Sequence, residues 1–385
     1  MNRFIILIVL FMSAIGSVQA QVPELINDPE FHPDAKAAVD SIYNFNFDGA
    51  HAHLASWRDK YPEHPIWMLL EGMEYWWKVL SDLEDTSHDE RFVNIMKKVD
   101  YQAGRFLHKY PSHADGLIVR TISNGYLARH NANRSNWVTS MRYGRKAMSA
   151  HQYLKEKQPN LADLKLAEGL KLYYTAYLPE AYPIVKTISW ALPSGNKEKG
   201  LQLIGEASEE AIFARGEATY FLGNINYNYE KRYNIAVRKF EELYNKYPNN
   251  NYYARILVKS YYKQHRYNKA FMAIEEILNR WKRNKLSHLK VMQEELLTWK
   301  GRILEKKNKP ERAVEAYKKA FAISSNLPNF SKRSFYTVSG YLAGKLLFSQ
   351  NKVIEAKSYL KKVGDAEVDN KYRDQSEELL KKIRD

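Results

Sequence analysis

Histidine is the residue type whose distribution most directly suggests chemistry, because nine of the 11 histidines lie between His32 and His151. Imidazole nitrogens are common metal ligands, so this concentration raises the question of a metal site. The spacing argues against one. On a helix His51 and His53 would point about 200° apart, and no carboxylate stands at a recognisable ligand interval from them. We therefore predict no metal site.

Catalytic motifs are the second kind of chemistry to consider. A hydrolase would need a serine elbow or positioned carboxylates, and a nucleotide-binding protein would need a glycine-rich loop that leads into a helix. Neither spacing occurs in the sequence. Acids that are distant in sequence, such as Glu74 and Asp115, could still meet in space. The interpretation we adopt is a protein that is not an enzyme and uses no cofactor.

The first 20 residues have the pattern of a cleavable signal peptide. Arg3 precedes an apolar run over 4–15, and the small residues Val18 and Ala20 stand three and one positions before Gln21. We expect export through this signal peptide and a mature chain, periplasmic or secreted, that begins at Gln21. Since the chain has no cysteine, its stability must come from an apolar core rather than from disulfides.

The charge balance favours an anionic partner. Lys and Arg number 59 against 44 Asp and Glu, which gives a formal net charge of +15. An acidic protein or an anionic lipid surface would suit this charge, whereas export argues against nucleic acid. The alternative is that the lysines are merely solvated on helix faces. We expect a protein or peptide partner in the cell envelope, with peripheral membrane association left open and no indication of the oligomeric state.

Internal repetition is the most informative feature of the sequence. Pairs of similar residues recur at a separation of 34, namely Tyr227 and Tyr261, Tyr233 and Tyr267, Ala236 and Ala270, and Phe240 and Ile274. Farther along the separation is 43, as between Gly301 and Gly344 and between Ala313 and Ala356. Repeats of the shorter length are typical of stacked helix pairs, and the longer interval indicates longer helices.

At these positions the sequence resembles the tetratricopeptide repeat, as found in exported bacterial proteins, where residues such as Gly301 and Ala313 let two antiparallel helices approach closely. Asn308 is expected to cap the helix that follows it. A residue before proline is disfavoured in a helix, so we expect helices to end at Tyr61, Tyr110 and Tyr247. The resemblance implies an all-α fold, an α-solenoid of tetratricopeptide-like helix pairs in a right-handed superhelix.

The repeats suggest a division of the chain into four segments. They are a signal peptide over 1–20, degenerate helical repeats over 21–172, a hydrophobic, proline-containing insertion over 173–200, and C-terminal repeats with a capping helix over 201–385. The insertion, which leads into Gly200-Leu201, resembles locally the hydrophobic segment of the Iml2-like tetratricopeptide family.

The resemblance also implies which residues line the concave groove. Transferred by register, the groove residues are Tyr252, Arg255, Lys259, Tyr262, Lys263, Arg302, Lys306, Tyr341 and Lys345. Lys259, Arg302 and Lys345 occupy equivalent positions in three successive units and would form a positive column, suited to an acidic segment or a chain-terminal carboxylate. The alternative is a solvated helix face. We interpret the protein as an adapter or scaffold that binds a protein or peptide segment in this groove.

Aromatic residues support a second interpretation, a module that binds glycans or anionic lipids. The segment 72–77 contains Trp76 and Trp77, and tryptophan stacks on sugars and lies at membrane interfaces. Helical spacing in this segment favours core packing instead. Four further tryptophans are similarly ambiguous, namely Trp137, Trp190, Trp281 and Trp299.

Overall fold

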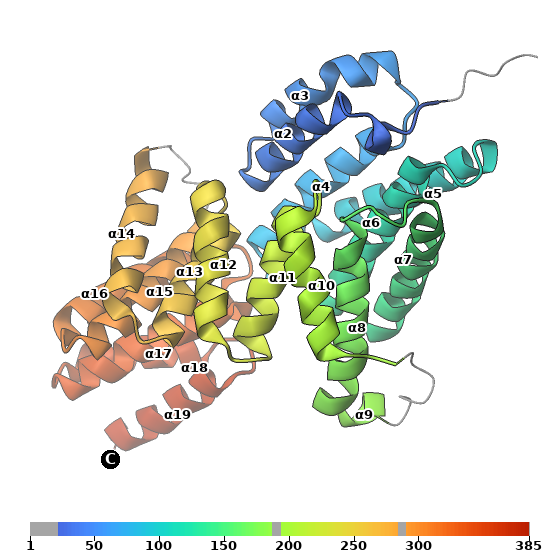
Figure 1. Cartoon of the computed structure of the whole chain (residues 1–385). Helices are drawn as coiled ribbons and strands as arrows, with labels where there is room; N and C mark the ends of the chain where they lie inside the picture. The colour runs from blue at the N-terminus through green and yellow to red at the C-terminus, as the bar shows by residue number, and fades with distance from the viewer. Residues whose placement is uncertain (1–21, 187–193, 284–289, 385) are drawn as a thin grey trace, which may run out of the picture.

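The computed structural model describes residues 22–186, 194–283 and 290–384 (Figure 1). The predicted signal peptide and Trp190 lie outside these ranges. Within them all regular structure is helical and no strand occurs. No helix in the described part of the chain is both long and apolar enough to cross a bilayer.

The helices follow one another along the whole chain. The N-terminal ones are η1 (Leu25–Asn27), α2 (Phe31–Tyr43), α3 (Phe47–Lys60), α4 (Ile66–Ser81), α5 (Asp89–Lys109), α6 (Ala114–Asn133), α7 (Trp137–Lys157), α8 (Leu164–Ala181) and α9 (Pro183–Lys186). The later ones are α10 (Lys197–Glu210), α11 (Arg215–Asn228), α12 (Tyr233–Lys246), α13 (Asn251–Lys263), α14 (Tyr267–Arg283), α15 (Lys290–Lys306), α16 (Pro310–Ser324), η3 (Phe330–Lys332), α17 (Ser334–Ser349), α18 (Val353–Gly364) and α19 (Lys371–Arg384).

Consecutive helices pack as pairs, which confirms the predicted all-α solenoid of helix pairs. The pairs are α2 with α3, α4 with α5, α6 with α7, α8 with α10, α11 with α12, α13 with α14, α15 with α16, and α17 with α18. Close approach explains the small residues, since a Cβ on Gly301 would overlap the ring of Tyr317. As predicted, α3, α5 and α12 end directly before Tyr61, Tyr110 and Tyr247.

Six of the turns inside these pairs share one backbone geometry. A residue with positive φ stands two positions before the second helix, and these residues are Phe45, Ser135, Lys231, His265, Asn308 and Asn351. The expectation that Asn308 caps α16 was therefore wrong. Its φ of 53° places it in the left-handed region of the turn, which asparagine tolerates well.

The segment predicted as an insertion, 173–200, forms the end of α8, the short α9 and the start of α10 where it is described. Asn196 caps α10 by accepting a hydrogen bond from the Lys199 amide. Gly169 and Gly200 let the two helices touch, since a Cβ on Gly169 would lie 2.8 Å from the Gly200 carbonyl oxygen. The proline-containing stretch thus connects the two members of one helix pair.

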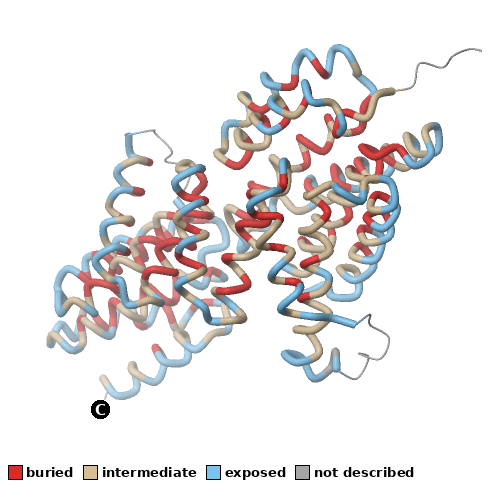
Figure 2. The backbone as a smooth tube through the Cα atoms, viewed as in Figure 1, coloured by how far each residue is buried: buried red, intermediate tan, exposed pale blue. Residues whose placement is uncertain are grey.

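Most helix contacts join neighbouring pairs, but a few join segments that are distant in sequence. Asn250, before α13, donates a hydrogen bond of 2.7 Å to the Tyr43 carbonyl at the end of α2. The Tyr247 hydroxyl donates to Asp40 at 2.6 Å, and α4 contacts α13. One hydrophobic core accordingly runs from Leu25 to Ile303, and Figure 2 shows its buried residues between the helix layers. The N-terminal helices fold back onto the middle of the array.

Candidate ligand-binding site

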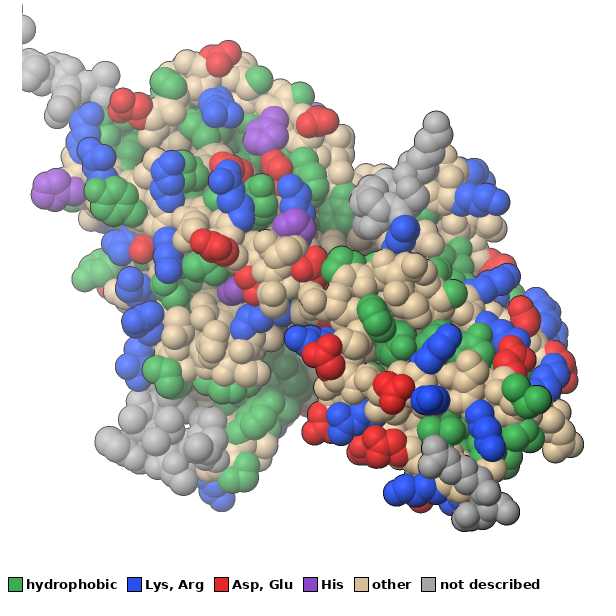
Figure 3. All heavy atoms as spheres, turned by 180° about the vertical axis from the view of Figure 1, so that it is seen from behind, with side chains coloured by type: hydrophobic (Ala, Val, Ile, Leu, Met, Phe, Trp, Pro, Cys, Tyr) green, Lys and Arg blue, Asp and Glu red, His purple; other side chains and the backbone are tan. Residues whose placement is uncertain are grey.

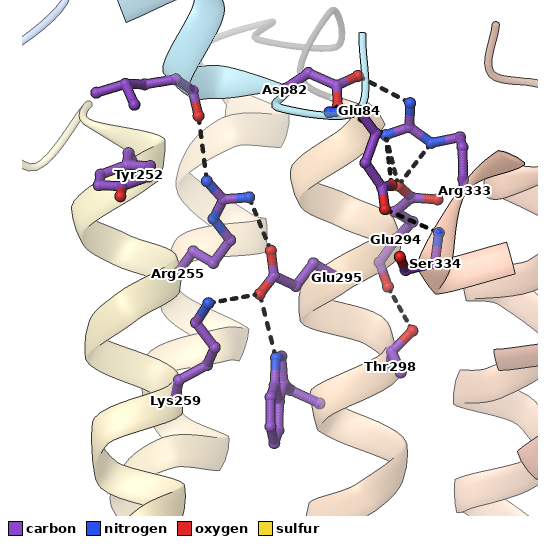
Figure 4. Close-up of polar contacts among 12 residues, drawn as sticks. Asp82, Glu84, Tyr252, Arg255, Lys259, Glu294, Glu295, Thr298, Arg333 and Ser334 are labelled. Carbon is purple, nitrogen blue, oxygen red and sulfur yellow. Dashed lines mark hydrogen bonds and ion pairs between the residues drawn. The ribbon is translucent and has the colours of Figure 1, made fainter. Parts of the chain in front are cut away.

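The predicted groove residues lie on three inner helices, α13, α15 and α17. Successive members of this inner layer contact one another, as α13 does α15 and α15 does α17. The layer is partly covered, because the segment between α4 and α5 lies across its N-terminal end (Figure 4). The contact between the α4–α5 segment and the inner layer thus lies next to the predicted groove.

Glu295 on α15 binds two of the predicted groove cations. Arg255 donates a hydrogen bond of 3.0 Å to its Oε2 atom, and the Lys259 ammonium lies 3.3 Å from Oε1 (Figure 4). Arg255 also donates to the Leu80 carbonyl at 3.3 Å. Burial alone would raise the pKa of Glu295, but Lys259 and Arg255 hold that pKa below its usual value. The two cations are therefore engaged internally rather than presented freely to solvent.

Arg333, directly before α17, joins two parts of the chain that are far apart in sequence. It donates to Glu294 at 2.9 Å and to both carboxylate oxygens of Asp82, 251 residues away, at 2.9 and 3.1 Å. Burial would lower the pKa of Arg333, yet Asp82 and Glu294 keep it above its usual value. Nearby, the Ser334 amide donates to Glu84 at 2.9 Å. This cluster, the Arg333 clasp, holds the α4–α5 segment on the inner layer.

A cavity of about 280 Å³ lies between these two groups of charges. Its lining includes Asp82, Glu84, Arg255, Lys259, Glu294, Glu295, Trp299 and Arg333. Glu294 and Arg255 each keep one buried polar atom, Oε2 and Nε, without a hydrogen-bond partner in the described part of the chain. Burial raises the pKa of Glu294 to about 7, against the opposing effect of Arg333. The cavity is therefore polar and has unused capacity for hydrogen bonds.

The predicted positive column divides into engaged and free cations. Lys259 pairs with Glu295. Arg302 donates to the Tyr372 hydroxyl of α19 at 2.9 Å and lies over the Trp299 ring at 4.8 Å. Lys345 is exposed and has no ion-pair partner among the described residues. Ligand binding by this column stays a prediction.

The remaining groove residues also fall into two groups. Tyr252 hydrogen-bonds Tyr220 at 2.8 Å, and the rings of Tyr262 and Tyr341 contact those of Trp299 and Tyr372. By contrast, Lys263 and Lys306 are exposed at the last positions of α13 and α15, where no described residue pairs with them. Among the predicted groove residues, the cations without an ion-pair partner in the described structure are therefore Lys263, Lys306 and Lys345.

The other residues with chemical potential have structural surroundings. Asp115 accepts hydrogen bonds from the Leu25 and Ile26 amides and from His64, whereas Glu74 pairs with His51, so these two acids do not meet. No group of three potential metal ligands occurs within the described ranges. Trp76 and Trp77 are buried, so they form core rather than a glycan platform.

The stacked helix pairs define an all-α helical-repeat protein with a tetratricopeptide-like fold. No protein-family model matches the sequence, and no curated protein matches it.

Similar solved structures include the human IFIT1 dimer with PPP-AAAA (12% identity, 92% of this chain and 73% of that one, TM-score 0.42). Yeast Tom70 (15%, 94% and 90%, 0.30) and a tetratricopeptide repeat protein from Parabacteroides merdae (15%, 80% and 97%, 0.33) are also similar.

Replacement of Arg333 by Met should destabilise the protein strongly, because it leaves Asp82 and Glu294 without their cation. Breaking a buried pair in this way costs about 3–5 kcal/mol of the free energy of unfolding, which urea titration measures. The matched control is Lys332→Met, which removes an exposed ion pair to Glu367 and should cost about 0–1 kcal/mol. Equal effects of the two changes would contradict the structural role of the clasp.

Glu294 should make stability depend on pH in a defined direction. Its pKa is about 7 in the folded chain and 4.5 in the reference state, so the folded protein binds the proton more tightly. Its contribution to the free energy of unfolding is therefore largest below pH 4.5 and is lost as the pH rises to about 7. We predict that wild type loses stability relative to Glu294→Gln over this window, measured by urea unfolding.

A control for this pH dependence is Glu367→Gln. The hydrogen bond from Ser331 lowers the pKa of Glu367, so its contribution is present above the unfolded pKa and is lost only at lower pH. A stability difference between wild type and Glu294→Gln that stays constant across the window would show that the carboxyl titrates normally.

Proposed function

We propose that this protein is an exported, non-enzymatic adapter that binds an acidic protein segment along the inner layer of its C-terminal repeats. The helical-repeat architecture supports such a role, because stacked helix pairs create an extended surface for a partner. The pattern of residues 1–20 supports export to the periplasm or the exterior. The mass of the chain recovered from its own cell, expected to begin at Gln21, tests the export step.

The observation that carries the proposal is the row of free cations on the inner layer. Lys263, Lys306 and Lys345 belong to three successive inner helices, and each is exposed without an ion-pair partner in the described structure. Lys263 and Lys306 occupy the same position in their repeats, and Lys345 stands about one helical turn earlier in its own repeat. Because residues one turn apart lie on the same side of a helix, all three lysines are on one face of the layer. A segment with spaced carboxylates could contact all three at once.

The cavity beside this row supplies a second point of recognition. The side chain of Lys259 is 27% exposed, so it is accessible while it pairs with Glu295. A ligand carboxylate could therefore share Lys259 with Glu295. Trp299, which packs against Tyr262 at 5.0 Å, adds apolar contact between the cavity and the row. We therefore place the bound segment across α13, α15 and α17.

Charge reversal of the row should abolish binding of an acidic peptide without unfolding the chain. The variant is Lys263→Glu, Lys306→Glu and Lys345→Glu, and the probe is a fluorescent glutamate-rich peptide measured by anisotropy. Loss of three charge-assisted contacts predicts a decrease in affinity of at least about 100-fold. The same peptide with Gln in place of Glu should bind weakly to wild type.

A matched control places the same charge change on the outer helices. Lys282, Lys319 and Lys357 lie on α14, α16 and α18, where they are exposed and unpaired in the described structure. Their replacement by Glu should leave most of the peptide affinity intact. If both triple variants lose affinity equally, net charge rather than the inner layer binds the peptide, and the adapter site is refuted.

A further inference from the structure

The positive charge of the protein is concentrated in one segment of its N-terminal half. Residues 91–157 contain thirteen Lys and Arg but only three Asp and Glu, which is a net charge of +10 out of +15 for the whole chain. This segment comprises most of α5, all of α6 and all of α7. Its charge is distributed unevenly between the buried and the exposed faces of these helices.

The inward cations of the segment are neutralised. Arg120 on α6 pairs with Asp100 at 3.1 Å, and Arg134 pairs with Asp89 at 2.6 Å. Arg129 pairs with Glu217 on α11. These arginines serve the packing of α6 against its neighbours, so they leave no charge for a partner.

Apart from Arg91, which pairs with Glu71 at 3.2 Å, the exposed cations of α5 and α7 are not neutralised. They are Lys97, Lys98, Arg105, Lys109, Arg142, Arg145, Lys146 and Lys157, and none is in an ion pair with another described residue. Arg142 and Lys146 flank the ring of Tyr143 at 5.5 and 5.7 Å. The two helices that carry these cations, α5 and α7, both pack on α6. Figure 3 shows Lys and Arg side chains among apolar ones along this side of the molecule.

Large apolar side chains are exposed among these cations. On the first turn and a half of α7, Trp137 is 56% exposed, Val138 79% and Met141 45%. Tyr101 on α5 is 65% exposed and Tyr153 on α7 is 59% exposed. Single exposed apolar residues are ordinary, but three within five positions, next to Arg142 and its neighbours, form a mixed apolar and cationic face.

We propose that the outer faces of α5 and α7 dock on a bilayer that contains anionic lipid. The cations bind headgroup phosphates, while Trp137, Val138 and Met141 enter the interfacial region, as apolar residues of membrane-surface helices do. The exposed apolar group favours lipid over a nucleic acid. A phosphate backbone would contact the cations but would leave Val138 and Met141 in water, whereas a bilayer buries them.

This surface is separate from the inner layer of α13, α15 and α17. The inference does not rest on the proposed adapter function, because each surface has its own cations. Docking through α5 and α7 would leave Lys263, Lys306 and Lys345 accessible. The protein would then hold its protein ligand at a membrane surface.

Vesicle sedimentation of the purified chain tests the inference. Vesicles of phosphatidylcholine with phosphatidylglycerol should pellet the protein, and vesicles of phosphatidylcholine alone should not. Replacement of Lys97, Lys98, Arg142, Arg145 and Lys146 by Gln should weaken binding by at least about tenfold, since each cation near an anionic surface contributes. The control is the same replacement at Lys282, Lys319 and Lys357, which should retain binding.

A second variant separates a membrane from other polyanions. Trp137→Ser, Val138→Ser and Met141→Ser should weaken vesicle binding several-fold but leave binding to a DNA duplex unchanged, because only lipid buries these side chains. All three positions are exposed, so this variant should fold. Full vesicle binding by the serine variant would overturn the membrane assignment in favour of a general polyanion surface. Equal binding of wild type to neutral and anionic vesicles would overturn the inference altogether.

Discussion

A buried guanidinium requires carboxylates, and Arg333 obtains them from two parts of the chain. Only 1% of Arg333 is exposed, so its charge is stable in the fold only while Asp82 and Glu294 remain in place. In a repeat array that contacted only its neighbours, Arg333 and Asp82 would lie far apart. The Arg333 clasp therefore holds the α4–α5 segment against the inner layer. Asn250 with Tyr43 and Arg129 with Glu217 reinforce the same closure.

Closure determines which part of the inner layer can meet a ligand. The end of α4 and the α4–α5 segment cover one end of the layer. There Arg255 donates a hydrogen bond to the carbonyl of Leu80, a residue of α4. Glu295 pairs with both Arg255 and Lys259 from within, because a buried cation needs a nearby anion. The predicted groove cations that remain free lie toward the C-terminal ends of the inner helices. The covering of one end thus shifts the available positive charge to Lys263, Lys306 and Lys345.

Local regularities made much of the fold predictable from the sequence. The separation of 34 residues, the small Gly301 and the tyrosine–proline pairs each reflect a constraint inside one helix pair, so each has a periodic signal. The ion pair between Arg333 and Asp82 has no periodic signal, since an interaction between distant segments leaves no pattern in the sequence of either segment. The positive φ of the turn residue Lys231 was also not predictable, because a left-handed position is usually indicated by a glycine. The repeat register places Arg255 on an inner helix, but it does not indicate which carboxylate Arg255 contacts.

The pairing of the cations distinguishes those that the fold requires from those that it does not. Arg120, Arg134 and Arg333 are each at least partly buried and each has a carboxylate, as desolvation demands. The exposed cations of α5 and α7 satisfy no such demand, and like charges close together repel one another. Folding therefore gives no reason to gather them on one face beside Trp137 and Val138. An anionic surface opposite this face supplies the reason, because it converts the repulsion among the cations into attraction and removes the apolar side chains from water.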